Sequence, residues 1–204
     1  MIVIIDYGMG NLRSIYKALK RLEIEAKISA NVHDIEAADR LILPGVGHFG
    51  RGMQNLRDMG LLEVLTRKVI EEKTPILGIC LGMQLFCKSS EEGASEGLGW
   101  LNAKTVRFDV QDKSQYKVPH IGWNSLAFRK EQPLFSGLQN QDLFYFVHSY
   151  HLVCHEDENV LSSTTYDYPF VSAVQKDNIF GTQFHPEKSR RIGLRILRNF
   201  SEGM

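Results

Sequence analysis

A cysteine lies between two glycines in a pattern suited to nucleophilic chemistry. Residues 78–82 read Gly-Ile-Cys-Leu-Gly, directly after an apolar run that predicts a buried strand. In a nucleophile elbow, glycines stand two residues before and two after the nucleophile, because the strand and the helix approach too closely for side chains there. Such a turn puts the sulfur at a helix N-terminus, which favours the thiolate. Cys80 is therefore a candidate nucleophile with the Leu81 amide as an oxyanion donor, and the alternative is a small apolar core residue.

A histidine and a carboxylate that would serve this nucleophile follow a strand-like run near the end of the chain. His185 and Glu187 are separated only by Pro186. In an extended segment, residues i and i+2 point to the same side, so the carboxylate would orient the imidazole and stabilise its protonated form. His185 would then act as a base toward Cys80 and as an acid toward a leaving amine. His-x-Glu is common by chance, so this prediction depends on the cysteine.

Two further features could complete such a site. Pro-Gly-Val-Gly at 44–47 ends a predicted strand, and its glycines would let backbone N–H groups approach a ligand, as an oxyanion hole requires. The same pattern is also that of an ordinary strand-ending turn. Gln84 lies one helical turn beyond Cys80 on the same face, where it would either bind substrate or be solvated.

The elements that must position these residues indicate an α/β protein. The first half of the chain alternates apolar strand runs with helical periodicity, which predicts a parallel sheet covered by helices. The second half is rich in β patterns and ends in a helix that Ser189 would cap. We predict a single α/β domain over residues 1–204, with a mixed, mostly parallel sheet flanked by helices and an additional antiparallel β region in the second half. The predicted strands are 2–5, 25–29, 40–43, 75–79, 104–109, 122–128, 143–148, 159–165, 170–175 and 179–184, and the helix after the cysteine is predicted at 81–88.

The composition excludes several classes of function. Lysine and arginine number 24, as do aspartate and glutamate, so no net charge favours nucleic acid or an anionic membrane as a partner. The three cysteines are odd in number and irregularly spaced, which argues against disulfides and a zinc site. We see no signal peptide and no apolar stretch near the ~20 residues of a membrane span. We expect a cytoplasmic protein without metal or cofactor.

Taken together, the motifs 44–47, 78–84 and 183–187 resemble those of class I (triad-type) glutamine amidotransferases. Four further segments resemble the glutaminase subunits of imidazole glycerol phosphate synthases, which act in histidine biosynthesis. These segments are 6–12, 119–124, 146–150 and 186–189. The resemblance runs over essentially the whole chain.

The resemblance implies a reaction and a set of residues. Cys80, His185 and Glu187 would form a triad that hydrolyses L-glutamine to glutamate and ammonia through a glutamyl thioester. The oxyanion hole would involve Gly47, after a peptide reorients, and Leu81. The residues that hold the glutamine would be Gln84, His148, Ser149 and Tyr150.

The resemblance also implies a partner. The ammonia would pass to a (β/α)8-barrel cyclase in a heterodimer, where it is used to make imidazole glycerol phosphate and an aminoimidazole-carboxamide ribotide. Asn11, His120, Trp123 and Asn124 match positions near that interface. Trp123 would be an anchor there, and the alternative is a core tryptophan. We expect the isolated chain to be a poor glutaminase that the liganded partner activates by orders of magnitude.

The sequence is also compatible with two other functions. A paralogous glutaminase would use the same triad to supply ammonia for amidation of a nucleotide-activated sugar in surface polysaccharide synthesis. A non-catalytic binding module on the same fold would lack the triad, whereas here all three positions are filled.

Overall fold

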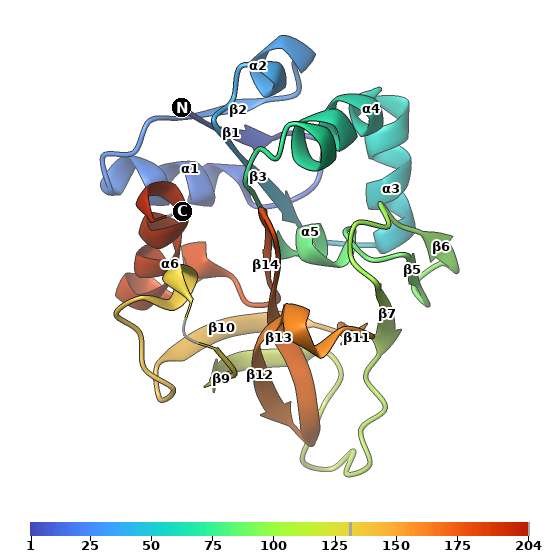
Figure 1. Cartoon of the computed structure of the whole chain (residues 1–204). Helices are drawn as coiled ribbons and strands as arrows, with labels where there is room; N and C mark the ends of the chain where they lie inside the picture. Colours follow the sequence, from blue (N-terminus) through green and yellow to red (C-terminus); the bar gives the residue numbers. More distant parts are fainter. Residues whose placement is uncertain (131, 204) are drawn as a thin grey trace.

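Five parallel strands form the half of the main sheet that carries the cysteine turn (Figure 1). The computed structural model describes residues 1–130 and 132–203. Across this part of the chain, the sheet order is β2-β1-β3-β4-β14-β13-β11-β7-β5-β6, with β12 paired to β13 and β9 to β12. The strands are β1 (Ile2–Ile5), β2 (Ala26–Ser29), β3 (Arg40–Gly45), β4 (Ile76–Cys80), β5 (Ser89–Ser90), β6 (Ser95–Glu96), β7 (Ala103–Arg107), β8 (His120–Ser125), β9 (Ala127–Phe128), β10 (Leu143–His148), β11 (Tyr150–Cys154), β12 (Val160–Tyr166), β13 (Tyr168–Lys176) and β14 (Ile179–Thr182).

Helices cover both faces of the parallel strands. The α-helices are α1 (Leu12–Arg21), α2 (Val32–Glu36), α3 (Phe49–Asp58), α4 (Leu61–Thr66), α5 (Leu81–Gln84) and α6 (Arg190–Glu202). A π-helical turn η1 (Arg67–Glu71) extends α4, and 3-10 turns occur at η2 (Pro133–Phe135), η3 (Asp157–Asn159) and η4 (Pro186–Lys188). Among the described helices, none is long and apolar enough to cross a lipid bilayer.

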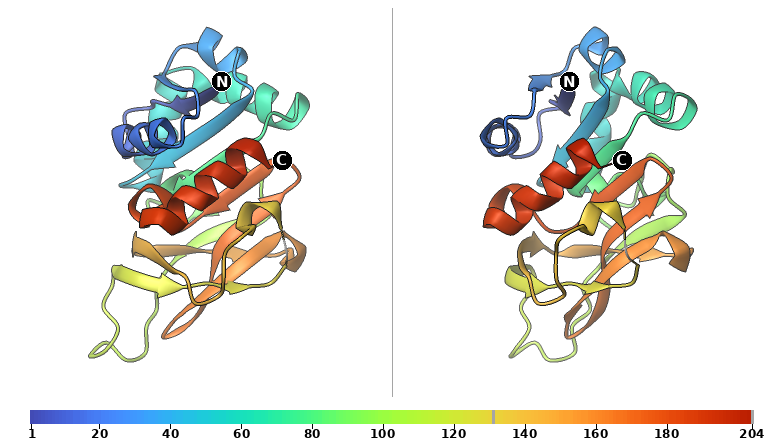
Figure 2. Two further views of the ribbon diagram at one scale, coloured as in Figure 1. Left: turned by 90° about the vertical axis from the view of Figure 1, so that its left-hand side faces the viewer. Right: turned by 60° about the vertical axis from the view of Figure 1, so that its left-hand side comes forward.

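The side-chain alternation of β1 divides the core into two parts. Val3 and Ile5 belong to a cluster that includes residues of α3 and α4, whereas Ile2 and Ile4 belong to a second cluster with residues of α1 and α6. All four are buried, which is why a parallel strand reads as a continuous apolar run. Figure 2 shows α6 lying beside α1 on one side of the molecule, next to the lower β region.

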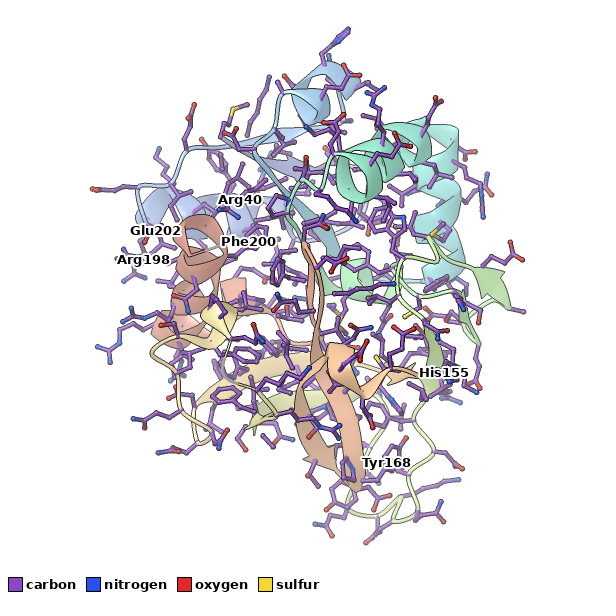
Figure 3. All side chains as sticks on the ribbon, in the orientation of Figure 1. Arg40, His155, Tyr168, Arg198, Phe200 and Glu202 are labelled. Atoms are coloured by element: carbon purple, nitrogen blue, oxygen red, sulfur yellow. The ribbon has the colours of Figure 1, made fainter. Side chains whose placement is uncertain are left out.

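Helix α6 is anchored to the second cluster by its apolar face and by one cation–π contact. Phe200 is fully buried, and the Arg40 guanidinium lies 5.8 Å from its ring centroid (Figure 3). The guanidinium therefore packs over the end of the aromatic core, and its partial burial lowers the pKa of Arg40 from its usual value.

A small two-stranded sheet of β8 and β10 closes the second cluster. The strands are antiparallel, with Trp123 opposite Tyr145. Phe144 and Phe146 point inward and are buried. The sequence predicts one strand over 143–148, and the structure contains a further strand, β11, directly after Ser149. The chain leaves the small sheet at that residue and enters the main sheet, where β11 pairs with β7 and β13.

The α/β architecture with a mostly parallel sheet and an additional antiparallel region agrees with the sequence prediction. The helix after Cys80 is shorter than predicted. It ends at Gln84, because the Phe86 and Cys87 amides bond to carbonyls only three residues back. Three very short elements, α2, β5 and β6, were not predicted, because five or fewer residues carry too little periodicity to recognise.

Candidate active site

Cys80 lies on a sharp turn between β4 and α5. Its backbone has φ +55° and ψ −110°, a conformation that costs an L-residue on the order of 1–3 kcal/mol. The glycines on either side of Cys80, Gly78 and Gly82, have no room for a side chain larger than hydrogen. A Cβ at Gly78 would lie 2.6 Å from the Met83 backbone nitrogen, and one at Gly82 would lie 1.8 Å from the Leu43 carbonyl oxygen. The structure therefore has the elbow geometry that the glycine spacing predicts.

The end of β3 packs directly on this elbow. Gly45 pairs with Cys80 in the sheet register, and a Cβ at Gly45 would lie 2.7 Å from the Gly82 nitrogen. The buried Tyr7 hydroxyl donates to the Pro44 carbonyl at 2.7 Å and fixes that peptide. Gly47 follows with φ +109°, a conformation that favours glycine. The Pro-Gly-Val-Gly segment is thus held against the cysteine turn.

His185 and Glu187 form a buried pair. The His185 Nδ1 and Glu187 Oε1 atoms are 2.9 Å apart, and each side chain is 1% exposed. Ser189 holds the backbone here, because its hydroxyl donates to the His185 carbonyl and accepts from the Tyr145 amide. The predicted extended segment is correct for His185 but wrong for Glu187, which lies in the 3-10 turn η4. The tight turn brings carboxylate and imidazole together.

The charges around His185 favour its protonated form. Burial alone would lower the pKa of the imidazole, but the Cys80 sulfur and the Glu187 carboxylate outweigh that penalty and raise the pKa to about 10. The Nε2 atom is buried and has no well-formed hydrogen bond within the described residues. A ring with Nδ1 fixed and Nε2 unbonded beside a sulfur is arranged to exchange a proton through Nε2.

A pocket of about 480 Å³ opens in front of Cys80. All the oxyanion and substrate residues predicted from the sequence line it. They are Gly47, Leu81, Gln84, His148, Ser149 and Tyr150. A larger cavity of about 720 Å³ lies between Phe128 and Asn140, and its lining contains neither cysteine nor histidine. The chemistry of the lining, rather than the volume, therefore identifies the candidate site.

Gln84 lines the pocket, but its amide nitrogen is already engaged. The Nε2 atom donates to the Tyr150 carbonyl and to Gln183 Oε1, both at 3.0 Å. Gln183 in turn donates to the Cys80 sulfur at 3.5 Å. Sequence reasoning did not single out Gln183, although it stands two residues before His185, where strand alternation puts both on one side.

His148 forms part of the pocket wall, and both of its ring nitrogens are bonded within the protein. Nδ1 lies 2.8 Å from the Tyr150 carbonyl oxygen, and Nε2 lies 3.1 Å from His120 Nδ1. Burial lowers the pKa of His148 well below its usual value. The lowered pKa keeps the ring neutral. A carbonyl oxygen only accepts, so Nδ1 carries the single proton. Any contact with a ligand must therefore use other atoms of this residue.

His120 does not lie at the surface, in contrast to the expectation that it contributes to an interface. It is 3% exposed and stacks on Phe146 and Tyr166. Burial lowers its pKa to about 4. The residue belongs to the aromatic core beneath β8, and it acts there as the hydrogen-bond partner of His148.

The other residues expected at an interface have surface positions. Trp123 is 42% exposed, with the Arg190 guanidinium 4.8 Å from its ring centroid. Asn124 is partly buried and donates to the Thr165 carbonyl, so its side chain also fixes β8 to β12. Asn11 is partly exposed just before α1 and makes no capping hydrogen bond with its side chain. Within the described residues, no group of three or more metal-ligating side chains was found.

Comparisons with known proteins identify the family. The model of the family described as glutamine amidotransferase class-I matches residues 3–203. This chain belongs to the class-I glutamine amidotransferases. It is 50% identical over 200 residues to the Methanococcus maripaludis protein named imidazole glycerol phosphate synthase subunit HisH 2, with 98% of both chains covered. It is 49% identical over 202 residues to the Pseudomonas aeruginosa protein of the same name, with 99% of both chains covered.

Solved structures agree with this assignment at the level of the fold. The amidotransferase is similar to a crystal structure described as glutamine amidotransferase, with a TM-score of 0.71, 25% identity, and coverage of 98% of this chain and 97% of that chain. It also resembles the structure of PurLQS from Thermotoga maritima, with a TM-score of 0.75, 18% identity, and coverage of 98% and 96%. The latter likeness concerns the fold alone.

Proposed function

We propose that this amidotransferase is the glutaminase subunit of an imidazole glycerol phosphate synthase in histidine biosynthesis. The observation that carries the proposal is that Cys80, which lines the pocket, lies beside the buried His185–Glu187 pair, more than a hundred positions away in the chain. The full-length identity to relatives named as subunits of that synthase supports the pathway.

In the proposed reaction, the Cys80 thiolate attacks the side-chain amide carbon of glutamine. The carbonyl π electrons move to oxygen and form a tetrahedral oxyanion. The protonated His185 gives its Nε2 proton to the amide nitrogen, the carbon–nitrogen bond breaks, and ammonia leaves a glutamyl thioester. His185 then takes a proton from water, whose oxygen attacks the thioester. Collapse of that intermediate releases glutamate and returns Cys80 to the thiolate, with Glu187 stabilising the imidazolium.

The amides of Gly47 and Leu81 are the proposed donors to the oxyanion. Both residues line the pocket at the cysteine turn. Donors of this kind stabilise charge that develops only in the transition state, and removing one costs about 10²–10³ in kcat. Gln84, His148, Ser149 and Tyr150 are the proposed contacts of the bound L-glutamine.

The proposed partner is a (β/α)8-barrel cyclase that receives the ammonia and makes imidazole glycerol phosphate and the aminoimidazole-carboxamide ribotide. The outer face of β8 and β10 supports this choice of docking face. Ile121, Trp123 and Leu143 are 60%, 42% and 49% exposed, an unusual density of large apolar side chains on a surface. Asn11 and Asn124 are proposed to lie at the edge of the contact.

The experiment that tests the catalytic proposal is Cys80→Ala in the complex with the cyclase. Glutamine-dependent synthesis should fall to background, whereas synthesis from added ammonium salt should stay at the wild-type rate, because the cyclase performs that step. Cys87→Ala is the matched control, since this thiol is fully buried elsewhere in the core. Survival of glutamine-dependent synthesis in Cys80→Ala would refute the proposal.

A separate variant tests the docking face. Trp123→Ala should weaken cyclase binding by about 2 kcal/mol, the size expected of a central aromatic anchor. Exposed Tyr16→Ala on α1 is the control. Equal affinities of the two variants would exclude the β8–β10 face. Titration by calorimetry measures both.

One observation favours a second candidate function. The relatives from Methanococcus maripaludis, Pseudomonas aeruginosa and Campylobacter jejuni carry the numbered names HisH 1 or HisH 2. Numbering of this kind fits organisms with more than one such subunit. A paralogue that supplies ammonia for amidation of a nucleotide-activated sugar therefore remains the alternative. Stimulation of glutaminase activity by the histidine-pathway cyclase with its nucleotide would select the first function, and no stimulation would select the second.

A further inference from the structure

A chain of hydrogen bonds between side-chain amides connects a backbone carbonyl to the Cys80 sulfur. Gln84 Nε2 donates to the Tyr150 carbonyl oxygen at 3.0 Å and to Gln183 Oε1 at 3.0 Å. Gln183 Nε2 then donates to Cys80 Sγ at 3.5 Å. Gln84 is 4% exposed and Gln183 is fully buried. These amides are therefore shielded from water, which would otherwise compete for the same bonds.

The direction of every donor in this chain is fixed from one end. The Tyr150 carbonyl oxygen only accepts, so Gln84 must turn its NH₂ group toward it. The second hydrogen of that group then requires an acceptor, and Gln183 must present its oxygen. The remaining end of the Gln183 amide, its NH₂ group, is thereby directed at the sulfur. Reversing either amide would bring lone pairs or hydrogens together at a buried junction.

We propose that Gln183 is a positioning residue that donates a hydrogen bond to the Cys80 thiolate and holds the Gln84 amide in one orientation. The proposal rests on the proposed function only in taking Cys80 as the nucleophile. An N–H donor stabilises the charged form of its acceptor, and an amide does so without titrating. The thiolate then has a second hydrogen-bond partner besides His185, both before it attacks and when it is released from the thioester.

The same bonds determine what Gln84 offers to a ligand. With Nε2 committed to Tyr150 and Gln183, the Oε1 atom is the remaining polar atom of this side chain, and the residue lines the pocket. An acceptor there would select a hydrogen-bond donor, such as an ammonium or amide NH group of the substrate. Gln183 therefore affects both the reactivity of the sulfur and the recognition of substrate.

Two variants at this position separate the two effects. Gln183→Met keeps the length of the side chain and removes both bonds. Gln183→Glu keeps an acceptor for Gln84 but replaces the donor to the sulfur with negative charge. Thr182→Val is the matched control. The Thr182 side chain is equally buried, and its hydroxyl donates to the Phe184 carbonyl. This variant therefore loses a neighbouring buried hydrogen bond that does not involve Cys80.

The measurement is the rate of Cys80 alkylation by iodoacetamide against pH in the full chain, with peptide mapping by mass spectrometry. The alkylation is selective for Cys80, because burial raises the pKa of Cys87 to about 12 and of Cys154 to about 11. In Gln183→Met, the pH midpoint of Cys80 alkylation should rise by about one unit, the size expected for one hydrogen bond to a charged group. The shift should be larger in Gln183→Glu and absent in Thr182→Val.

Steady-state kinetics of the complex give the second readout. Both Gln183 variants should lower kcat for glutamine. Gln183→Met should also raise KM by about tenfold, because Gln84 is released, whereas Gln183→Glu should leave KM near the wild-type value. A purely structural role would lower the melting temperature in all three variants without moving the alkylation midpoint.

The proposal is overturned if the midpoints of Gln183→Met and Gln183→Glu coincide with that of Thr182→Val. If Gln183→Met does not fold, the comparison of Gln183→Glu with Thr182→Val decides alone. This failure is distinct from failure of the proposed function. Loss of glutamine-dependent synthesis in Cys80→Ala with unmoved midpoints refutes only the role of Gln183, whereas survival of that synthesis refutes the proposed function whatever the midpoints are.

Discussion

His185 and His148 are buried to nearly the same extent near the same sulfur, yet their surroundings favour opposite charge states. His185 is 1% exposed and His148 is 6% exposed. Burial penalises the imidazolium in both. The carboxylate of Glu187 and the sulfur of Cys80 reverse that penalty for His185, and raise its pKa to about 10. His148 has only a carbonyl and a neutral imidazole as partners, and its pKa stays far below the usual value.

The difference shows that burial alone does not decide the charge of a histidine, because negatively charged partners can outweigh it. It also leaves one charged imidazole rather than two near the sulfur, because burial, together with the nearby His185, lowers the pKa of His148. The proposed proton donor is thus the histidine that carries charge, and the neighbouring histidine contributes shape and hydrogen bonds. Substitutions on either side of this contrast should remove it or reveal its size.

Glu187→Gln should produce the largest effect, because it removes one of the two charges that favour the His185 imidazolium, the one that also holds Nδ1. Glutaminase kcat in the complex should fall by about 10³–10⁴, as expected when a triad carboxylate becomes an amide. The melting temperature should change little, since a glutamine oxygen still accepts from Nδ1. A kcat within tenfold of wild type would contradict this account. The control is Glu36→Gln, a carboxylate in an exposed ion pair with Arg67.

His120→Asn should change the response of stability to acid. The pKa of His120 falls from its ordinary 6.5 to about 4 on folding. Above pH 6.5 the ring is neutral in both the folded and the unfolded state, so its full contribution to the free energy of unfolding is present. That contribution is lost as the pH falls toward 4, because the unfolded state binds the proton first. Asparagine keeps a donor near the Nδ1 position but does not titrate. The loss of unfolding free energy between pH 6.5 and 4 should therefore shrink by about 2 kcal/mol. Parallel curves for variant and wild type, from urea titrations at each pH, would exclude the effect.

His148→Asn should have a smaller effect on catalysis than any triad variant. The asparagine amide would still donate to the Tyr150 carbonyl, and only the bond to His120 would be lost. We expect kcat within about tenfold of wild type, because one buried hydrogen bond accounts for roughly 1 kcal/mol. Stopped-flow measurement of glutamate release checks this. A loss as large as that of Glu187→Gln would mean that His148 carries a proton in the reaction.

Tyr168→Phe should have the smallest effect. A third buried histidine, His151, bonds to the Tyr168 hydroxyl at 3.0 Å and to the Leu152 carbonyl. Figure 3 shows Tyr168 at the lower end of the β region, far from the elbow. Removing the hydroxyl should cost about 1 kcal/mol of unfolding free energy and leave kcat unchanged. Thermal unfolding and the glutaminase assay test both parts, and a fall in kcat would extend the site to His151.

The sequence predicts those parts of the molecule that depend on local patterns. The apolar runs of β1 and β4 are buried on both faces, so they are recognisable without knowing their neighbours. The glycines around Cys80 are required by backbone approach within a few residues, and the His-x-Glu pair spans a single turn. Each of these features was predicted, although the turn at Glu187 was not.

What the sequence does not predict depends on partners far along the chain. The proposed role of Gln183 depends on its hydrogen bonds to Gln84 and Cys80, about a hundred residues away. His120 was expected near an interface because the segment 119–124 resembles family positions there. In the structure β8 has an inverted pattern, with histidine inward and Ile121 and Trp123 outward. An inverted pattern follows when the outer face of a strand binds another protein, and alternation alone does not reveal which side is covered.

The apolar outer face of β8 and β10 has a consequence for the cell that makes this protein. If this is the proposed docking face, Ile121, Trp123 and Leu143 stay in contact with water whenever the subunit is produced in excess, and such exposed apolar patches favour aggregation. Matched synthesis of the two chains would limit the lifetime of this species. Expression of both chains from a shared transcript would achieve that balance. The amount of this subunit, as well as its turnover rate, would then depend on the second subunit.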